Sequence, residues 1–344
     1  EGGVFRYWFP VAEKKSDGSF SLLCGGRTYT LLLNWLDKNG TSVQKESVTV
    51  QRNLDPSLAV AQVGNYTYET LADAVNAAQS GDMITLLQDI DNSLDKAGYT
   101  GGMSYTLKEG VTLNGNGKTI SGHVGISIPA GGATVTNVNF KNIHNNTVVS
   151  QETCDYYGWT SKTGNQSAIY ASGLTGTATI TNCIFDNVDW DAIQITPLNT
   201  ANIVITGNTF QHTGTDSTQL RYIHVEHTAS SATISMSQLT ITDNCFFNTK
   251  NPSDDILCSV GIWRVHKNTP TLNLSGNYVE DYTKVELGAL NITQLFPARS
   301  NPSQNTDDYQ PVAYDSYHGP KLFTTLQDAA DKSELYIKLM DDAA

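Results

Sequence analysis

A short motif recurs five times between residues 133 and 281 and constrains the fold more than any other feature of the chain. Each copy carries an aliphatic residue, a large apolar residue five positions later, and a short polar residue two positions beyond that. The apolar pairs are Val135/Phe140, Ile180/Phe185, Ile205/Phe210, Ile241/Phe246 and Leu274/Val279. The polar residues are Asn142, Asn187, His212, Asn248 and Asp281. One short unit repeated at uneven intervals is typical of a solenoid, in which each unit stacks on the previous one.

A second β-prone segment precedes each of the later copies of the motif. These segments read SAIYAS, DAIQIT, YIHVEH and GIWRVH, and they begin at residues 167, 191, 222 and 261. Two or three short strands per repeat, stacked at the usual strand spacing of about 4.8 Å, predict a parallel β-helix. The 25 residues from Phe185 to Phe210 are close to one bare coil, so longer intervals must contain loops. The largest loop is expected at about residues 144–166.

Residues 1–57 differ from the repeats and are predicted to form a small β-rich, sandwich-like domain or cap. Their runs RYWFPVA, SFSLLCG, TYTLLLNWLD and SVTVQR are apolar and rich in strand-forming residues. Asn39-Gly40 is a turn signal between the last two runs. The aromatic residues Tyr7, Trp8, Phe9 and Trp35 are predicted to be core residues.

A short capping helix is expected at about residues 70–79, near the start of a β-helix that spans residues 58–297. Its apolar stripe consists of Leu71, Ala74, Val75 and Ala78. Thr70, with Asp73 three residues later, resembles a capping box. A helix in this place would cover the apolar interior at the open end of the solenoid.

Residues 298–344 are predicted to be a polar linker followed by a second, cap-like sequence. Residues 323–329 match residues 68–74, and residues 337–340 match residues 84–87 after a two-residue deletion. This echo either closes the far end of the β-helix or opens another module.

Taken together, the repeats resemble the right-handed parallel β-helix superfamily, the pectin-lyase-like fold. The segment at residues 68–90 is similar to a motif common at the start of β-helix modules in large bacterial cell-surface proteins. The resemblance covers about residues 60–295 and implies an all-β fold in a bacterial protein that is secreted or attached to the cell surface. It implies no single activity, because lyases, hydrolases, epimerases, adhesins and passive stalks share this fold.

Two standard activities of the superfamily are not supported by the motifs present. The nearest match to the paired aspartates of polygalacturonases is Asp189-Trp190-Asp191, and the other polygalacturonase motifs are absent. The calcium-binding acidic cluster of pectate lyases, with its basic proton acceptor, has no counterpart either.

Alignment of the four β-prone segments predicts a row of outward-facing side chains. The inward residues would be Ile169, Ile193, Ile223 and Ile262, and the outward row Tyr170, Gln194, His224 and Trp263. Arg264 lies beside the row, and the loop at 144–166 adds Tyr156, Tyr157 and Trp159. Aromatic faces with a few polar groups suit a carbohydrate-binding groove. An ordinary solvated face of a solenoid would have a similar composition.

The same surface also offers residues for catalysis. Asp191 and Glu226 come from successive coils, and a glycosidase needs two carboxyl groups about 5–9.5 Å apart. Asp189 flanks this pair. A lyase would instead use His224 as the base, with Arg264 to neutralise charge.

Charge and composition narrow the choice of partner. The net charge of −13 disfavours nucleic acid, and no apolar run is long enough to insert into a membrane. No cofactor is expected, and the calcium site that Asp89, Asp91 and Asp95 would allow lacks a recognised motif. Cys183 and Cys245 lie inside repeats as small apolar fillers, whereas Cys154 and Cys258 lie where pairing stays open. Because no signal-like segment follows Glu1, a mature or trimmed chain is expected.

The leading hypothesis is therefore a β-helix protein that recognises a polysaccharide or surface glycan without catalysis, as an adhesin does. The alternative is a polysaccharide lyase or glycoside hydrolase. A third hypothesis, which the repeated cap favours, is a structural spacer. The expected state is a monomer or one part of a larger modular surface protein.

Overall fold

The computed structural model describes most of the repeat region and parts of both ends of the chain. The described residues are 12–14, 20–22, 28–51, 56–92, 104–122, 124–143, 167–188, 191–198, 200–213, 221–226, 236–247, 258–263, 271–279, 283–286, 313–315, 321–323, 325–332 and 337–339.

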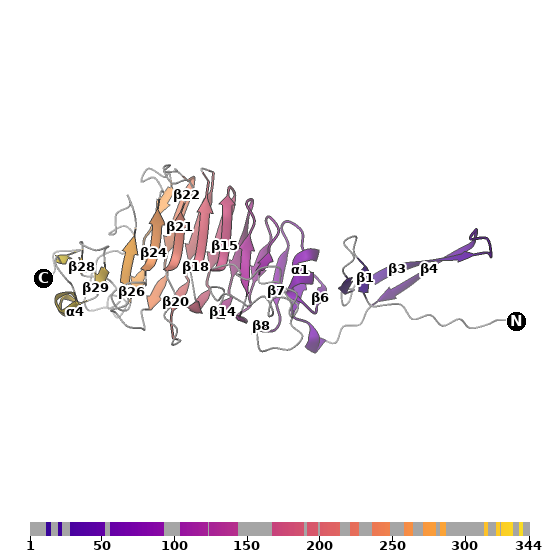
Figure 1. Cartoon of the computed structure of the whole chain (residues 1–344), viewed down its shortest axis with the longest axis horizontal. Coiled ribbons are helices and arrows are strands. Elements are labelled where there is room, and N and C mark those ends of the chain that lie inside the picture. The colour runs from indigo at the N-terminus through magenta and orange to yellow at the C-terminus, as the bar shows by residue number, and fades with distance from the viewer. Residues whose placement is uncertain are drawn as a thin grey trace, which may run out of the picture.

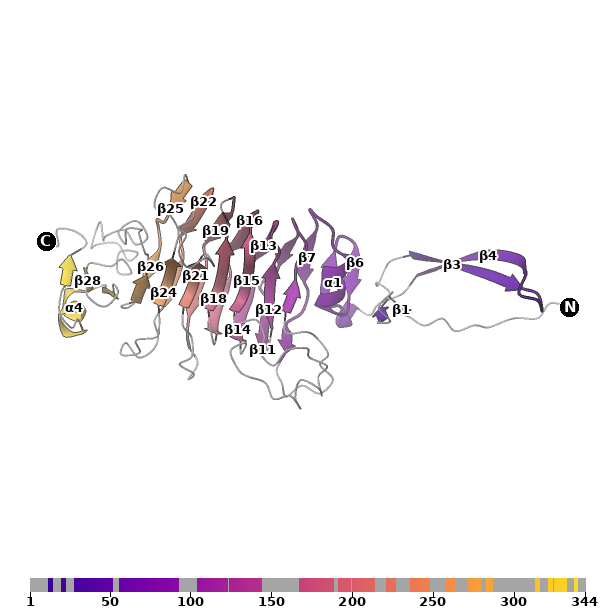
Figure 2. The ribbon, with the colours of Figure 1, turned by 45° about the horizontal axis from the view of Figure 1, so that its top comes forward.

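The repeats form a parallel β-helix in which each coil contributes one strand to each of three sheets (Figures 1 and 2). The first sheet contains β7 (Met83–Leu86), β10 (Thr112–Asn114), β13 (Gly132–Thr136), β16 (Thr177–Thr181), β19 (Asn202–Thr206), β22 (Gln238–Thr242) and β25 (Thr271–Asn273). The second contains β8 (Ile90–Asn92), β11 (Thr119–Gly122), β14 (Asn139–Ile143), β17 (Ile184–Val188), β20 (Thr209–Gln211), β23 (Cys245–Phe247) and β26 (Tyr278–Val279). The third contains β9 (Ser104–Thr106), β12 (Gly125–Ile128), β15 (Ser167–Leu174), β18 (Asp191–Pro197), β21 (Arg221–Glu226), β24 (Cys258–Trp263) and β27 (Thr283–Glu286). The predicted all-β solenoid is confirmed.

The predicted apolar pairs form ladders along the interior. Phe140, Phe185, Phe210 and Phe246 pair in register and stack with ring centroids 5.0–5.1 Å apart and planes inclined by 6°. All four are at most 1% exposed. Ring stacking at the strand spacing is what parallel coils with identical residues dictate.

A buried asparagine ladder lies between the first and second sheets and was not predicted from the sequence. It consists of Asn208, Asn244 and Asn277, each at most 1% exposed. The side-chain amide of Asn208 donates to Ile180 O, and its Oδ1 accepts from Cys183 N. Asn244 repeats this pattern one coil later. The ladder therefore satisfies buried backbone groups at each turn.

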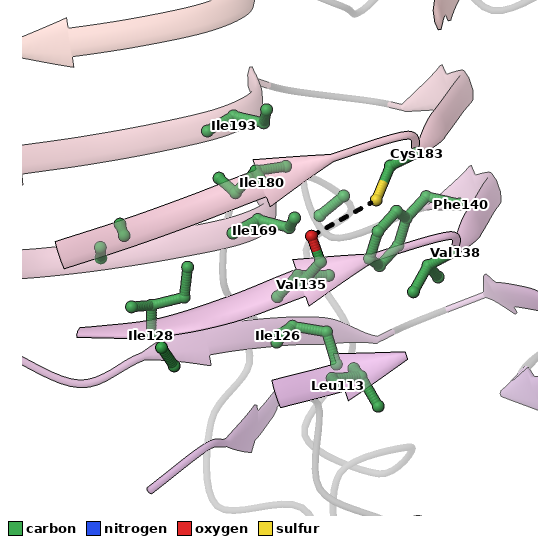
Figure 3. Packing of buried hydrophobic residues seen from close by; sticks show 14 of the residues in the cluster. Leu113, Ile126, Ile128, Val135, Val138, Phe140, Ile169, Ile180, Cys183 and Ile193 are labelled. Atoms are coloured by element: carbon green, nitrogen blue, oxygen red, sulfur yellow. Dashed lines mark hydrogen bonds between the residues drawn. The ribbon is translucent and has the colours of Figure 1, made fainter. Parts of the chain in front are cut away.

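In the coil before that of Asn208, Cys183 occupies the position that the ladder asparagines occupy in the later coils. Its Sγ lies 3.9 Å from Val135 O (Figure 3), where the other coils place an amide nitrogen. Burial raises the pKa of this thiol from 9.0 to about 12. The predicted role as a small buried filler is confirmed, with a weak hydrogen bond in addition.

Cys183 is therefore expected to resist iodoacetamide in the native chain, because the reactive thiolate is scarce below its raised pKa. The folded state holds the thiol proton more tightly than the unfolded state, so protonation of Cys183 stabilises the fold. This stabilisation is complete below about pH 9. It should be lost as the pH rises toward 12. Site-resolved mass spectrometry of native and urea-unfolded chain measures the labelling. Equal labelling of Cys183 in both states would contradict the expectation.

The predicted polar turn positions are partly described. Asn142 and Asn187 adopt left-handed backbone with φ of 52° and 57°, and Asn187 Nδ2 donates to Asn142 Oδ1 at 2.8 Å. His212 is buried. Asn248 and Asp281 lie outside the described residues.

The first coil is capped by a hairpin and a helix. The elements are η1 (Pro56–Leu58), β5 (Ala61–Val63), β6 (Tyr66–Tyr68) and α1 (Leu71–Ala77). Thr70 is the N-cap as predicted, because its Oγ1 accepts from Asp73 N at 3.1 Å. The helix ends two residues before the predicted boundary, since Ala78 turns to a ψ of 144°.

The N-terminal segment contains two antiparallel pairs. β1 (Ala12–Lys14) pairs with β2 (Phe20–Leu22), and β3 (Thr28–Leu36) pairs with β4 (Ser42–Gln51) around Gly40. Tyr7, Trp8 and Phe9, which were predicted to be core residues, lie outside the described residues. The prediction that Trp35 is a core residue is wrong. It is 41% exposed, because no second layer of described residues covers this hairpin.

The C-terminal echo of the cap forms α4 (Leu326–Lys332) and β30 (Ile337–Leu339), as its sequence match implies. It also contains β29 (Lys321–Phe323), which the match reaches only at Phe323, and β28 (Ala313–Asp315), a strand within the predicted linker. β29 pairs antiparallel with β27, which joins this unit to the last coil of the third sheet.

Candidate functional site

The outer face of the third sheet carries the predicted row of side chains across its central strands. Tyr170 pairs with Gln194, and Gln194 pairs with His224, in adjacent coils. Tyr170 and Gln194 are half-buried and His224 is 7% exposed. The inward placement of Ile169, Ile193 and Ile223 is confirmed by their complete burial.

The predicted place of Trp263 in this row is wrong. Val260, not Ile262, pairs with Ile223, so Gly261 lies beside His224 and Trp263 lies beside Glu226. A shift of two residues keeps the same side chains on the inward face, because side chains alternate with a period of two. The apolar pattern therefore fits both registers equally well.

His224 lies between two carboxylates, and this cluster is the most distinctive arrangement on the face. Its Nδ1 is 2.6 Å from Asp191 Oδ2, and its Nε2 is 3.1 Å from Glu226 Oε2. Asp191 is completely buried, whereas the Glu226 side chain is 31% exposed. The three residues form a chain that runs from the interior of the sheet to its surface.

The hydrogen bonds of this cluster depend on where its protons lie. Ionised carboxylates only accept hydrogen bonds, and a neutral imidazole has a single N–H to donate. Donation from both ring nitrogens at once requires a proton on each of them.

Neighbouring strands position these side chains. Asp191 begins β18 and pairs with Ser167, the first residue of β15. Ser167 Oγ donates to Gln194 Oε1 at 3.2 Å and is itself completely buried. Ser167 was missed in the sequence, although aligning SAIYAS with DAIQIT places it beside Asp191.

The open pair of carboxylates expected for a glycosidase is not formed. Asp191 is buried and faces His224, so the imidazole fills the space between it and Glu226. A scissile bond needs both carboxyl groups to reach the substrate. Asp191 is therefore placed to orient His224 rather than to contact a ligand.

The remaining predicted site residues fall outside what the structure describes. Tyr156, Tyr157, Trp159, Asp189 and Arg264 are not described, and only the backbone of Trp263 is.

Among the described residues, no group of His, Cys, Asp or Glu side chains, the cluster of Asp191, His224 and Glu226 included, has an arrangement that could hold a metal ion. Two of the aspartates considered for calcium bond to the next coil instead. Asp89 Oδ1 accepts from Thr119 N at 2.8 Å, and Asp91 Oδ1 lies 3.4 Å from Ser121 Oγ. Asp95 is not described.

A second polar surface lies at the turn between the first and second sheets. It is a shallow hollow of about 230 Å³ lined by Asn114, Asn116, Gly117, Asn137, Asn139 and Asn182. These amides serve the solenoid turn, as when Asn139 Nδ2 donates to Gly117 O at 2.9 Å. The hollow is therefore explained by turn geometry.

Stacked coils that each place one strand in each of three sheets define the class of parallel β-helix proteins. The chain belongs to the family described as the right handed beta helix region, whose model matches residues 106–289. No curated protein and no solved structure was found to match the chain. No helix among the described residues is long and apolar enough to cross a membrane.

Proposed function

We propose that the outer face of the third sheet binds a polysaccharide or surface glycan and performs no chemistry on it. The observation that carries this proposal is the in-register row of Tyr170, Gln194 and His224, with Glu226 partly exposed beside it. An aromatic ring suits the face of a sugar, while amide and carboxylate groups bond its hydroxyls. The row crosses coils at about 4.8 Å, so successive coils present successive contacts.

The charge of the surface favours a particular class of glycan. The chain carries a net charge of −13, and the cluster around His224 adds a carboxylate at the surface. Neutral or amino sugars therefore suit the site better than polyuronates, which negative surface potential would repel. We propose adhesin-like recognition outside a bacterial cell or on its surface, by a monomer or a part of a larger modular protein.

Wild-type chain is expected to bind at least one neutral or amino-sugar glycan on an array. Glu226→Gln and Tyr170→Ala should each weaken this binding about tenfold, because a lost charged hydrogen bond or aromatic contact costs about 1–3 kcal/mol. Thr179→Ala, on the outer face of the first sheet, is the matched control and should bind normally. Absence of binding by the wild type to any glycan would exclude the proposal.

One observation favours an enzyme as the second candidate. The buried carboxylate of Asp191 orients His224, an arrangement that prepares an imidazole for proton transfer. In a lyase or hydrolase, His224 with Glu226 would then act on a sugar bound at the surface. New reducing ends or unsaturated products from a polysaccharide panel, lost in Glu226→Gln, would favour this candidate. Binding without such products leaves recognition as the function.

A further inference from the structure

The C-terminal unit repeats the N-terminal cap strand for strand. In the first cap, β5 pairs antiparallel with both β6 and β7, so that Ala61 lies opposite Tyr68 and Leu86. In the C-terminal unit, β28 pairs antiparallel with both β29 and β30, so that Ala313 lies opposite Phe323 and Leu339. The two units therefore share one topology and one register.

The helices of the two units also correspond. Ala74 N donates to Thr70 O at 3.3 Å, and Ala329 N donates to Thr325 O at 3.2 Å. Ala74 and Ala329 are both completely buried. The correspondence thus extends from the hairpin through the first turn of the helix and its packing onto the strands.

The two units differ in what covers them. Ile84 and Leu86 are completely buried beneath the first coil, whereas the equivalent Ile337 and Leu339 are 43% and 53% exposed. The helical position shows the same contrast, because Leu71 is 1% exposed and Leu326 is 46% exposed. The C-terminal unit therefore exposes to solvent the apolar face that the following coils cover in the first cap.

The open face includes a strand edge. β7 uses one edge for β5 and the other for the parallel strand β10, which places Leu113 beside Ile84. β30 uses one edge for β28 and ends its sheet among the described strands. Unpaired edges with apolar side chains are templates for another strand.

We propose that residues 313–339 are the opening cap of a second β-helix, and that β30 and α4 bind a parallel β-helical coil. The first cap indicates what binds to such an exposed face. There the identical register is covered by coils that follow the cap in the same polypeptide, beginning with β8 and β10. The pairing of β27 with β29 then joins two β-helices end to end, as in a rigid tandem stalk.

The test grafts coils onto the C-terminal unit of the full chain. A copy of residues 87–143 replaces residues 340–344, so that the added segment follows Leu339 as it follows Leu86 in the first cap. The graft is expected to resist proteolysis and to slow hydrogen exchange at β30 amides about tenfold or more, because their strand gains a partner. Ile337→Lys with Leu339→Lys in the grafted chain should abolish both effects. In the ungrafted chain, the same pair should leave the first β-helix unchanged by circular dichroism.

Two results would overturn the proposal. If proteases digest the grafted segment and hydrogen exchange at the β30 amides is unchanged, the C-terminal unit merely closes the first β-helix. Concentration-dependent association of the ungrafted chain in sedimentation, lost in Leu339→Lys, would show that the occupant is a second copy. Neither readout depends on glycan binding, so this proposal fails or stands independently of the proposed function.

Discussion

Phe210→Ala is expected to destabilise the β-helix by about 3–5 kcal/mol. Phe210 stacks on Phe185 and Phe246, each with centroids 5.0 Å away, and its ring also contacts Tyr222 at 5.4 Å. It is completely buried, and the rigid coils on either side cannot close the resulting cavity. The substitution therefore loses apolar burial and the stacking that couples three coils.

Urea unfolding followed by circular dichroism measures this loss. Because a solenoid unfolds through coupled neighbouring units, the slope of the transition must be compared between variants as well as its midpoint. Ile184→Ala is the matched control. It removes apolar atoms from the adjacent coil at a side chain that is 38% exposed, so its cost should stay below about 1 kcal/mol. Equal losses in the two variants would show that the aromatic ladder does not hold the coils together.

Asn244→Ala is expected to cost about 3 kcal/mol or more, although it removes only a few atoms. Asn244 Nδ2 donates to Ile205 O and Asn277 Oδ1, each at 3.0 Å. Its Oδ1 accepts from the backbone N–H and the side chain of Asn208. Alanine removes the donor to Ile205 O. It also removes the acceptor for the backbone N–H and for the side-chain amide of Asn208. Each buried group left unsatisfied costs about 1–3 kcal/mol.

The matched control for this variant is Asn202→Ala. Asn202 Nδ2 also bonds to the neighbouring coil, to Thr177 Oγ1 at 3.3 Å, but water reaches this site. Its loss should cost less than about 1 kcal/mol in the same urea titration. If Asn244→Ala proves as mild as the control, water must replace the amide inside the turn, and the ladder would not be a structural requirement.

Several features of the fold follow from local sequence patterns. The spacing of Val135 and Phe140, repeated along the chain, predicted stacked coils, because parallel stacking of a repeated unit places its equivalent residues in register. Thr70 and Asp73 predicted where the helix begins, because an N-cap involves only neighbouring residues. The likeness of residues 323–329 to residues 68–74 predicted a second helix at α4.

The asparagine ladder shows the limit of such patterns. Asn208, Asn244 and Asn277 stand beside many other asparagines in turn sequences, and composition does not separate buried from exposed ones. Their burial depends on backbone groups of the preceding coil, such as Ile180 O, which are far away in the sequence. Turn propensity alone therefore pointed to Asn142 and Asn187 instead.

The repeated spacing of apolar residues was sufficient to establish the all-β solenoid, because inward ladders depend on local alternation. The arrangement of the candidate site required the three-dimensional pairing of strands. Trp263 lies beside Glu226 rather than in the row of His224, since a two-residue slip preserves alternation and leaves no trace in the apolar pattern. Asp191 orients His224 rather than facing a ligand, because a carboxylate is buried only where adjacent coils supply its partner.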